Sequence, residues 1–197
     1  LAFSTFWFVE KQQTETLNVK QITPLTATEA TEYRASFSPN GQYVAFQRYV
    51  DAQTSHIWVK DLTDNSEYQL TSESAIYGKP EWSPDGTQIA LHKSATKEDV
   101  NKSGKCYAIT SLSFALAKNS PQPVRQLIPC ENEVITSLTW LTNHSFVYTL
   151  GNVKNNPVIE VNLNKKTRRI LYQNKNKISY ELTFSTHNST LAFLQVG

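Results

Sequence analysis

The amino-acid sequence of 197 residues predicts an all-β fold: a partial β-propeller with about three full four-stranded blades and half of a further blade. A ten-residue motif carries this prediction, with copies at Phe37 (FSPNGQYVAF) and Trp82 (WSPDGTQIAL) and looser copies at Trp140 (WLTNHSFVYTL) and Phe184 (FSTHNSTLAFL). These four aromatic residues, here called the anchors, are 45, 58 and 44 residues apart. Periods of roughly 40 to 45 residues are typical of propeller blades. A β-sandwich also has short strands, but it does not predict one motif repeated in register.

Each anchor begins a tight turn between two strands. In Ser-Pro-Asn-Gly and Ser-Pro-Asp-Gly, proline presets the backbone angle of the second turn position. Asn or Asp and then Gly tolerate positive φ, so the chain can reverse sharply. Apolar residues flank the turn, and the combination predicts a β-hairpin that forms the first two strands of a blade.

Two further strands are expected after each hairpin. The third strand is an alternating segment that ends on leucine, at Ile57–Leu62, Tyr107–Leu112 and Val158–Leu163. The fourth strand follows a polar turn, at Tyr68–Thr71, Val124–Ile128 and Arg169–Gln173. Lys20–Thr23 resembles this fourth strand and is expected to be an outer strand near the N-terminus. No helix is expected.

The strand count divides the chain into a membrane-proximal or linker segment, residues 1–17, and propeller repeats, residues 18–197. The last repeat lacks its third and fourth strands, so the sequence is expected to be the first part of a longer propeller. Incomplete blades expose apolar edges. We therefore expect a swapped assembly, a possible homo-oligomer, or an edge that another molecule shields.

The two cysteines, Cys106 and Cys130, fall at the start of the third strand and the end of the fourth strand of the second blade. If these strands pair residue i with residue 236 − i, the hairpin tip lies at Lys118–Pro121 and the cysteines lie opposite each other. A disulfide would close 23 intervening residues. It would contribute roughly 3 kcal/mol and indicate an oxidising compartment. Two buried free thiols are the alternative.

Composition disfavours several function classes. The net charge of +2 argues against nucleic-acid binding. The basic stretch within 151–197 is interpreted as a solvated hairpin tip rather than a phosphate site. Glycine-rich phosphate loops and the Gly-x-Ser-x-Gly elbow are absent, so neither a cofactor nor an enzyme activity is expected. The four histidines do not have the spacing of metal ligands; they are His56, His92, His144 and His187. Four aspartates are expected to lie in solvated turns; they are Asp51, Asp61, Asp64 and Asp85. Trp58, Trp82 and Trp140 are interpreted as packing between blades.

The motif F/W-S-P-D/N-G-x-x-I/V-A, followed by Ile57–Leu62 (IWVKDL), resembles the TolB-type propeller repeat. The resemblance implies a non-catalytic binding or sensory propeller on the periplasmic side of the inner membrane. Its nearest form is the propeller domain of a ToxR/CadC-like membrane-bound regulator, which responds to a protein partner or a small molecule. Leu1–Val9 is uncharged and is interpreted as the end of a transmembrane helix or as a buried strand. A TolB-like periplasmic scaffold and the gating propeller of a prolyl-oligopeptidase-like serine peptidase are two further possibilities that the resemblance leaves open.

Overall fold

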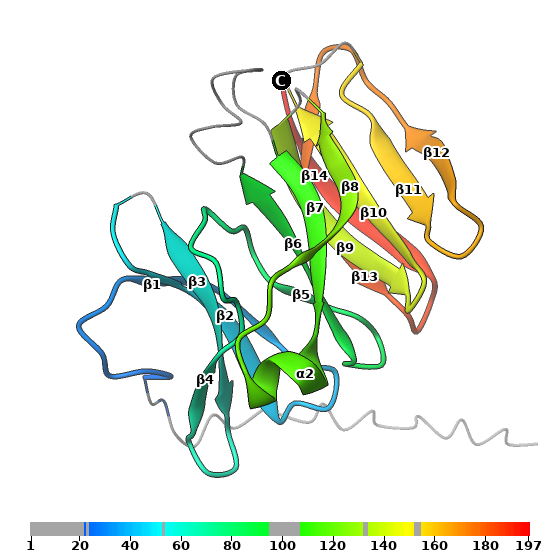
Figure 1. The fold of residues 1–197 in the computed structure, drawn as a ribbon. Coiled ribbons are helices and arrows are strands. Elements are labelled where there is room, and N and C mark those ends of the chain that lie inside the picture. Colours follow the sequence, from blue (N-terminus) through cyan, green and yellow to red (C-terminus); the bar gives the residue numbers. More distant parts are fainter. Residues whose placement is uncertain (1–21, 23, 53, 95–106, 132–133, 152–154) are drawn as a thin grey trace, which may run out of the picture.

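The computed structural model describes residues 22, 24–52, 54–94, 107–131, 134–151 and 155–197. The described strands form three four-stranded antiparallel sheets and one two-stranded sheet (Figure 1). Blade 1 contains β1 (Glu32–Phe37), β2 (Tyr43–Tyr49), β3 (Ser55–Asp61) and β4 (Glu67–Gln69). Blade 2 contains β5 (Glu81–Trp82), β6 (Gln88–Ser94), β7 (Tyr107–Ser113) and β8 (Arg125–Glu131). Blade 3 contains β9 (Val134–Thr142), β10 (Ser145–Gly151), β11 (Val158–Asn162) and β12 (Thr167–Tyr172), and blade 4 contains β13 (Ile178–Ser185) and β14 (Thr190–Val196).

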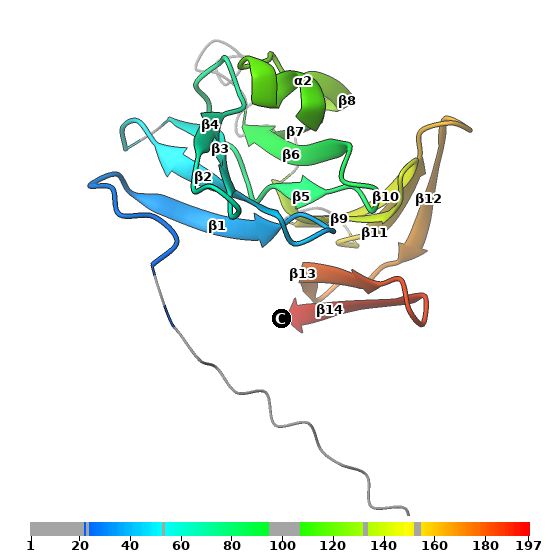
Figure 2. The same ribbon diagram turned by 90° about the horizontal axis from the view of Figure 1, so that it is seen from below.

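The sheets follow one another in chain order around an arc, as a propeller requires (Figure 2). Strands within each sheet also follow chain order, so every blade is an antiparallel meander. The first strands of successive blades contact each other: β1 with β5, β5 with β9, and β9 with β13. The predicted β-propeller fold is therefore confirmed.

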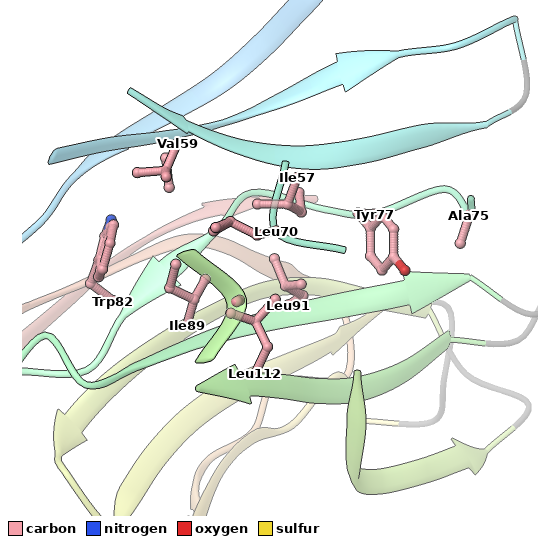
Figure 3. Packing of buried hydrophobic residues seen from close by; sticks show 11 residues of the cluster. Ile57, Val59, Leu70, Ala75, Tyr77, Trp82, Ile89, Leu91 and Leu112 are labelled. Atoms are coloured by element: carbon pink, nitrogen blue, oxygen red, sulfur yellow. The ribbon is translucent and has the colours of Figure 1, made fainter. Parts of the chain in front are cut away.

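The hydrophobic core lies between the blades. One buried cluster joins blade 1, through Ile57, Val59 and Leu70, to blade 2 (Figure 3). A second joins blade 2 to the aromatic-rich face of blade 3, and a third, smaller cluster joins blade 3 to blade 4. Each thin sheet therefore buries apolar residues mainly against the neighbouring sheets.

In the turns of blades 1 and 2, the glycines adopt positive φ as predicted, whereas the residues that precede them do not. Gly41 and Gly86 both have φ of 70°, the left-handed conformation that glycine adopts without steric cost. Asn40 and Asp85 do not have positive φ. Their side chains accept hydrogen bonds instead: Asn40 Oδ1 accepts from the Ser38 hydroxyl at 2.6 Å and Asp85 Oδ1 from the Ser83 hydroxyl at 2.6 Å. These polar residues close the turn as hydrogen-bond acceptors rather than through unusual backbone angles.

The expectation that the chain has no helix is wrong. A short helix, α2 (Phe114–Asn119), stands where the hairpin tip of blade 2 was predicted. Residues with high helix propensity fill the segment FALAKN, and Phe114 and Ala117 fall on one face of it. The Phe114 ring lies edge-on to Tyr43 and Trp82, with both ring centroids at 4.8 Å. The helix therefore closes one end of the core between blades 1 and 2.

The predicted register of the β7–β8 hairpin is correct near α2, where Ser111 pairs with Arg125. Two irregularities then shift the register, so that Tyr107 pairs with Glu131. Cys130 lies on β8, whereas Cys106 lies outside the described residues, so the Cys106–Cys130 disulfide stays a prediction.

Several N-terminal predictions also fall largely outside the described residues. These are the segment 1–17 with its apolar run Leu1–Val9, and most of the proposed outer strand Lys20–Thr23. Ile22, which is described, is highly exposed and belongs to no strand. Within the described ranges, no helix combines the length and apolar character needed to cross a membrane.

Candidate functional site

A pocket of about 320 Å³ lies where all four blades meet, and we call it the central pocket. Arg34 on β1, Lys79 just before β5, Ser137 on β9 and Glu181 on β13 line it, one from each repeat. Each of these residues lies three positions before the anchor of its repeat. The repeat therefore places the same position of every blade at the pocket wall.

Arg34 and Glu181 reach the pocket through matching backbone irregularities. Arg34 has φ of 59° and lies where the β1–β2 register shifts between Tyr33 and Ser36. Glu181 has φ of 52° and lies at the corresponding shift in β13–β14, between Tyr180 and Thr183. A bulge of this kind leaves a residue out of the ladder and redirects its side chain. The two outermost described blades thus present a cation and an anion in the same way.

Only part of the charge in the central pocket is neutralised by the protein itself. Lys79 Nζ and Glu81 Oε1 form an ion pair at 2.8 Å. Burial raises the pKa of Glu81; Lys79 lowers it, and the nearby charge of Glu181 raises it further. Among the described residues, neither Arg34 nor Glu181 has an ion pair or a side-chain hydrogen bond partner. The described part of the pocket therefore keeps one uncompensated positive group and one uncompensated negative group.

His92 on β6 forms another part of the pocket wall. The imidazole packs directly against Gly78, where a Cβ atom would lie only 1.9 Å from its Nε2. Tyr107 lies edge-on to it at a centroid distance of 6.2 Å. No described residue forms a hydrogen bond with the ring. Burial, with a contribution from the charge of Arg34, lowers the pKa of His92 to about 4, so the ring is neutral at pH 7.

Hydroxyl groups hold the pocket wall of blade 3 against blade 4. Ser137 Oγ accepts a hydrogen bond from the Leu182 N–H at 2.8 Å. Thr136 Oγ1 donates to the Ser179 carbonyl at 2.7 Å. These bonds fix the backbone on either side of Glu181, so the wall around this side chain is preorganised.

Two of the anchors link neighbouring blades by an equivalent hydrogen bond. Trp82 Nε1 donates to the Ser36 carbonyl at 3.2 Å, and Trp140 Nε1 donates to the Glu81 carbonyl at 3.0 Å. Both acceptors immediately precede the anchor of the previous repeat. Phe37, the first anchor, is 68% exposed, because no described blade precedes it.

Two other aromatic residues differ from this pattern. Phe184 is partly buried and has no side-chain N–H to donate. Trp58 was predicted to pack between blades, but its ring lies 4.3 Å from the Arg48 guanidinium carbon. Arg48 in turn pairs with Glu32 at 2.6 Å and Glu67 at 2.7 Å, so this cluster joins strands of blade 1.

The central pocket was not predicted from the sequence, although the sequence contains a signal for it. The residue three positions before each anchor lines the pocket, but these four residues are of different types: Arg34, Lys79, Ser137 and Glu181. For His92 the sequence indicated only that it has no metal-ligand spacing with the other histidines. The described residues contain no group of three or more His, Cys, Asp or Glu side chains that could hold a metal ion.

Comparisons with known proteins agree with the fold. A scan against protein-family models finds no match. The Tol-Pal system protein TolB of Alcanivorax borkumensis is 34% identical over 56 residues, which are 28% of this chain and 13% of that protein. The crystal structure of TolB from Acinetobacter baumannii has a TM-score of 0.69 at 15% identity, covering 88% of this chain and 40% of that chain. A structure from an analysis of two prolyl endopeptidases has a TM-score of 0.61 at 13% identity, covering 80% and 24%.

These likenesses define the class of fold: the chain has a β-propeller fold that is similar to that of TolB. The chain spans well under half the length of each of these three proteins. At these identities the structural likenesses establish the fold alone.

Proposed function

We propose that this chain is part of a non-catalytic, extracytoplasmic propeller that binds a protein partner at its central pocket. One observation carries the proposal: equivalent positions of four blades converge on one pocket, and two of them present charges of opposite sign that no described residue pairs. Charges that have no partner inside the protein favour recognition by a complementary molecule. The likeness to TolB supports a periplasmic scaffold over a regulator domain or a peptidase propeller.

A sensory domain of a membrane-bound transcriptional regulator is a narrower form of this proposal. Partner binding would then shift the assembly state of the membrane protein, which requires different affinities for its states. The apolar segment Leu1–Val9 favours this form, but it lies outside the described residues. The likeness to a prolyl endopeptidase extends to the fold and carries no argument for catalysis here.

Site-specific photo-crosslinking in living cells tests the binding role. A photoreactive amino acid that replaces Lys79 is part of the pocket wall. One that replaces Leu116, on the exposed side of α2, serves as a matched control. We expect a discrete crosslinked protein from position 79 and none from position 116. Arg34→Glu should abolish that product, because it reverses the charge at the pocket. Identical products from both positions, or no product from position 79, would contradict the proposal.

A further inference from the structure

The charges around the central pocket sum to zero. Arg34 and Lys79 are the cations that line it, and Glu81 and Glu181 are the anions. Lys79 and Glu81 pair with each other, which leaves Arg34 on β1 and Glu181 on β13. These two groups form no ion pair within 4.0 Å, although they line the same pocket. A ligand that is neutral as a whole but carries one charge at each end would satisfy both.

We propose that the central pocket binds a short peptidic group that carries one carboxylate and one ammonium, with the carboxylate against Arg34 and the ammonium against Glu181. This inference rests on the binding role proposed above and specifies the chemistry of what is bound.

The Arg34 side of the pocket suits a carboxylate. A guanidinium presents paired N–H groups that match the two oxygens of a carboxylate. His92 lines the same pocket, and its ring has no hydrogen-bond partner among the described residues. A neutral imidazole always carries one N–H, so it offers a further donor to the same anion. The charge of Arg34 contributes to the lowered pKa of His92, in agreement with both residues lining this pocket.

The Glu181 side suits an ammonium. Glu181 is an exposed residue that lines the pocket, and it has no cationic partner in the described part of the chain. Its negative charge is felt by Glu81, so a second carboxylate lies close by. An ammonium group donates three hydrogen bonds and can be shared by more than one acceptor. A cation here would also relieve the repulsion between the two carboxylates.

The size of the pocket is consistent with a small peptidic group. The volume of about 320 Å³ lies within the range of small-molecule sites. The two charged residues stand on different blades, β1 and β13, and both line this one volume. The bulged backbone gives both residues the same left-handed conformation, so both leave the strand ladder in the same way.

Isothermal titration calorimetry of the full-length protein with dialanine and trialanine tests the inference. We expect the free peptides to bind. N-acetylation or C-terminal amidation should each weaken binding by about tenfold or more, because each removes one charge-assisted contact. An N-acetylated, amidated Lys-Ala-Glu peptide carries the same charges on side chains, so tighter binding of that probe would identify a protein segment as the natural source. Binding of the doubly blocked alanine peptides as tight as that of the free peptides would overturn the inference.

Variants at the two poles provide the matched controls. Arg34→Asn and Glu181→Asn remove one charge each, and asparagine tolerates the left-handed backbone at both positions. We expect each to weaken peptide binding by about tenfold, with unchanged thermal unfolding. The double reversal Arg34→Glu with Glu181→Arg should restore binding, because the ligand can bind in the opposite direction. Single variants that bind as the parent protein does would overturn the inference. A persisting crosslink at position 79 would then show that the wider binding role survives.

Discussion

The central pocket should make the stability of the protein depend on pH through His92. Burial lowers the pKa of this residue from 6.5 to about 4. Between these values the unfolded chain binds a proton that the folded chain does not, so stability falls as the pH falls through this window. The linkage relation gives a loss of about 2 kcal/mol at pH 5 relative to pH 7.5. This is an upper value, because the ring still meets water in the pocket.

His92→Gln should remove this dependence. Glutamine is neutral, and the same position of blade 1, ten residues after the anchor, is occupied by Gln47. Urea unfolding at several pH values between 5 and 7.5 measures the difference between the variant and the parent protein. Comparing the variant with the parent protein cancels the contributions of other titrating groups to the pH dependence. One of these groups is Glu81, whose raised pKa stabilises the fold at lower pH. His144→Gln, in an exposed turn, is the matched control and should leave the pH dependence unchanged.

Two outcomes would refute this reasoning. If the parent protein and His92→Gln lose stability in parallel as the pH falls, the imidazole does not lie in the environment described. If His144→Gln removes the dependence instead, the effect arises from a surface turn rather than from the pocket.

Three further predictions concern packing and cross-linking. Trp82→Phe removes the donor to the Ser36 carbonyl and leaves a small void, so urea unfolding should show a loss of about 2 kcal/mol; an unchanged midpoint would contradict the blade-linking role. Phe37→Ser should change stability by no more than about 0.5 kcal/mol in the same assay, because the side chain is exposed, and a loss as large as that of Trp82→Phe would show that this face is covered. Replacing Cys106 and Cys130 by serine should cost roughly 3 kcal/mol under oxidising conditions and nothing under reducing conditions; equal stabilities in both would exclude the disulfide.

The blades could be predicted from the sequence because their turns repeat. Pro and Gly at fixed positions after Phe37 and Trp82 specify a hairpin through backbone chemistry, independently of the rest of the chain. Helix α2 was missed because a six-residue segment has little periodicity, and its formation depends on packing of Phe114 against Tyr43 and Trp82 from outside the segment.

The central pocket could not be predicted for a different reason. Its residues share a position in the repeat but not a side-chain type, so the motif does not reveal them. The bulges at Arg34 and Glu181 bring these side chains to the pocket. Neither arginine nor glutamate is a residue type prone to positive φ, so the sequence does not indicate the bulges. The unpaired state of the two charges becomes apparent only when the neighbouring residues are placed.

Because each apolar layer lies between two successive sheets, loss of one sheet exposes the apolar residues of the next sheet to solvent. In such an arrangement, interactions between nearest neighbours set the local free energy of each sheet. The layer beneath β13 and β14 contains three buried residues, against eleven in the layer between blades 1 and 2. Amide hydrogens of the final hairpin should accordingly exchange with deuterium earliest, and protection should rise toward the Trp82 layer.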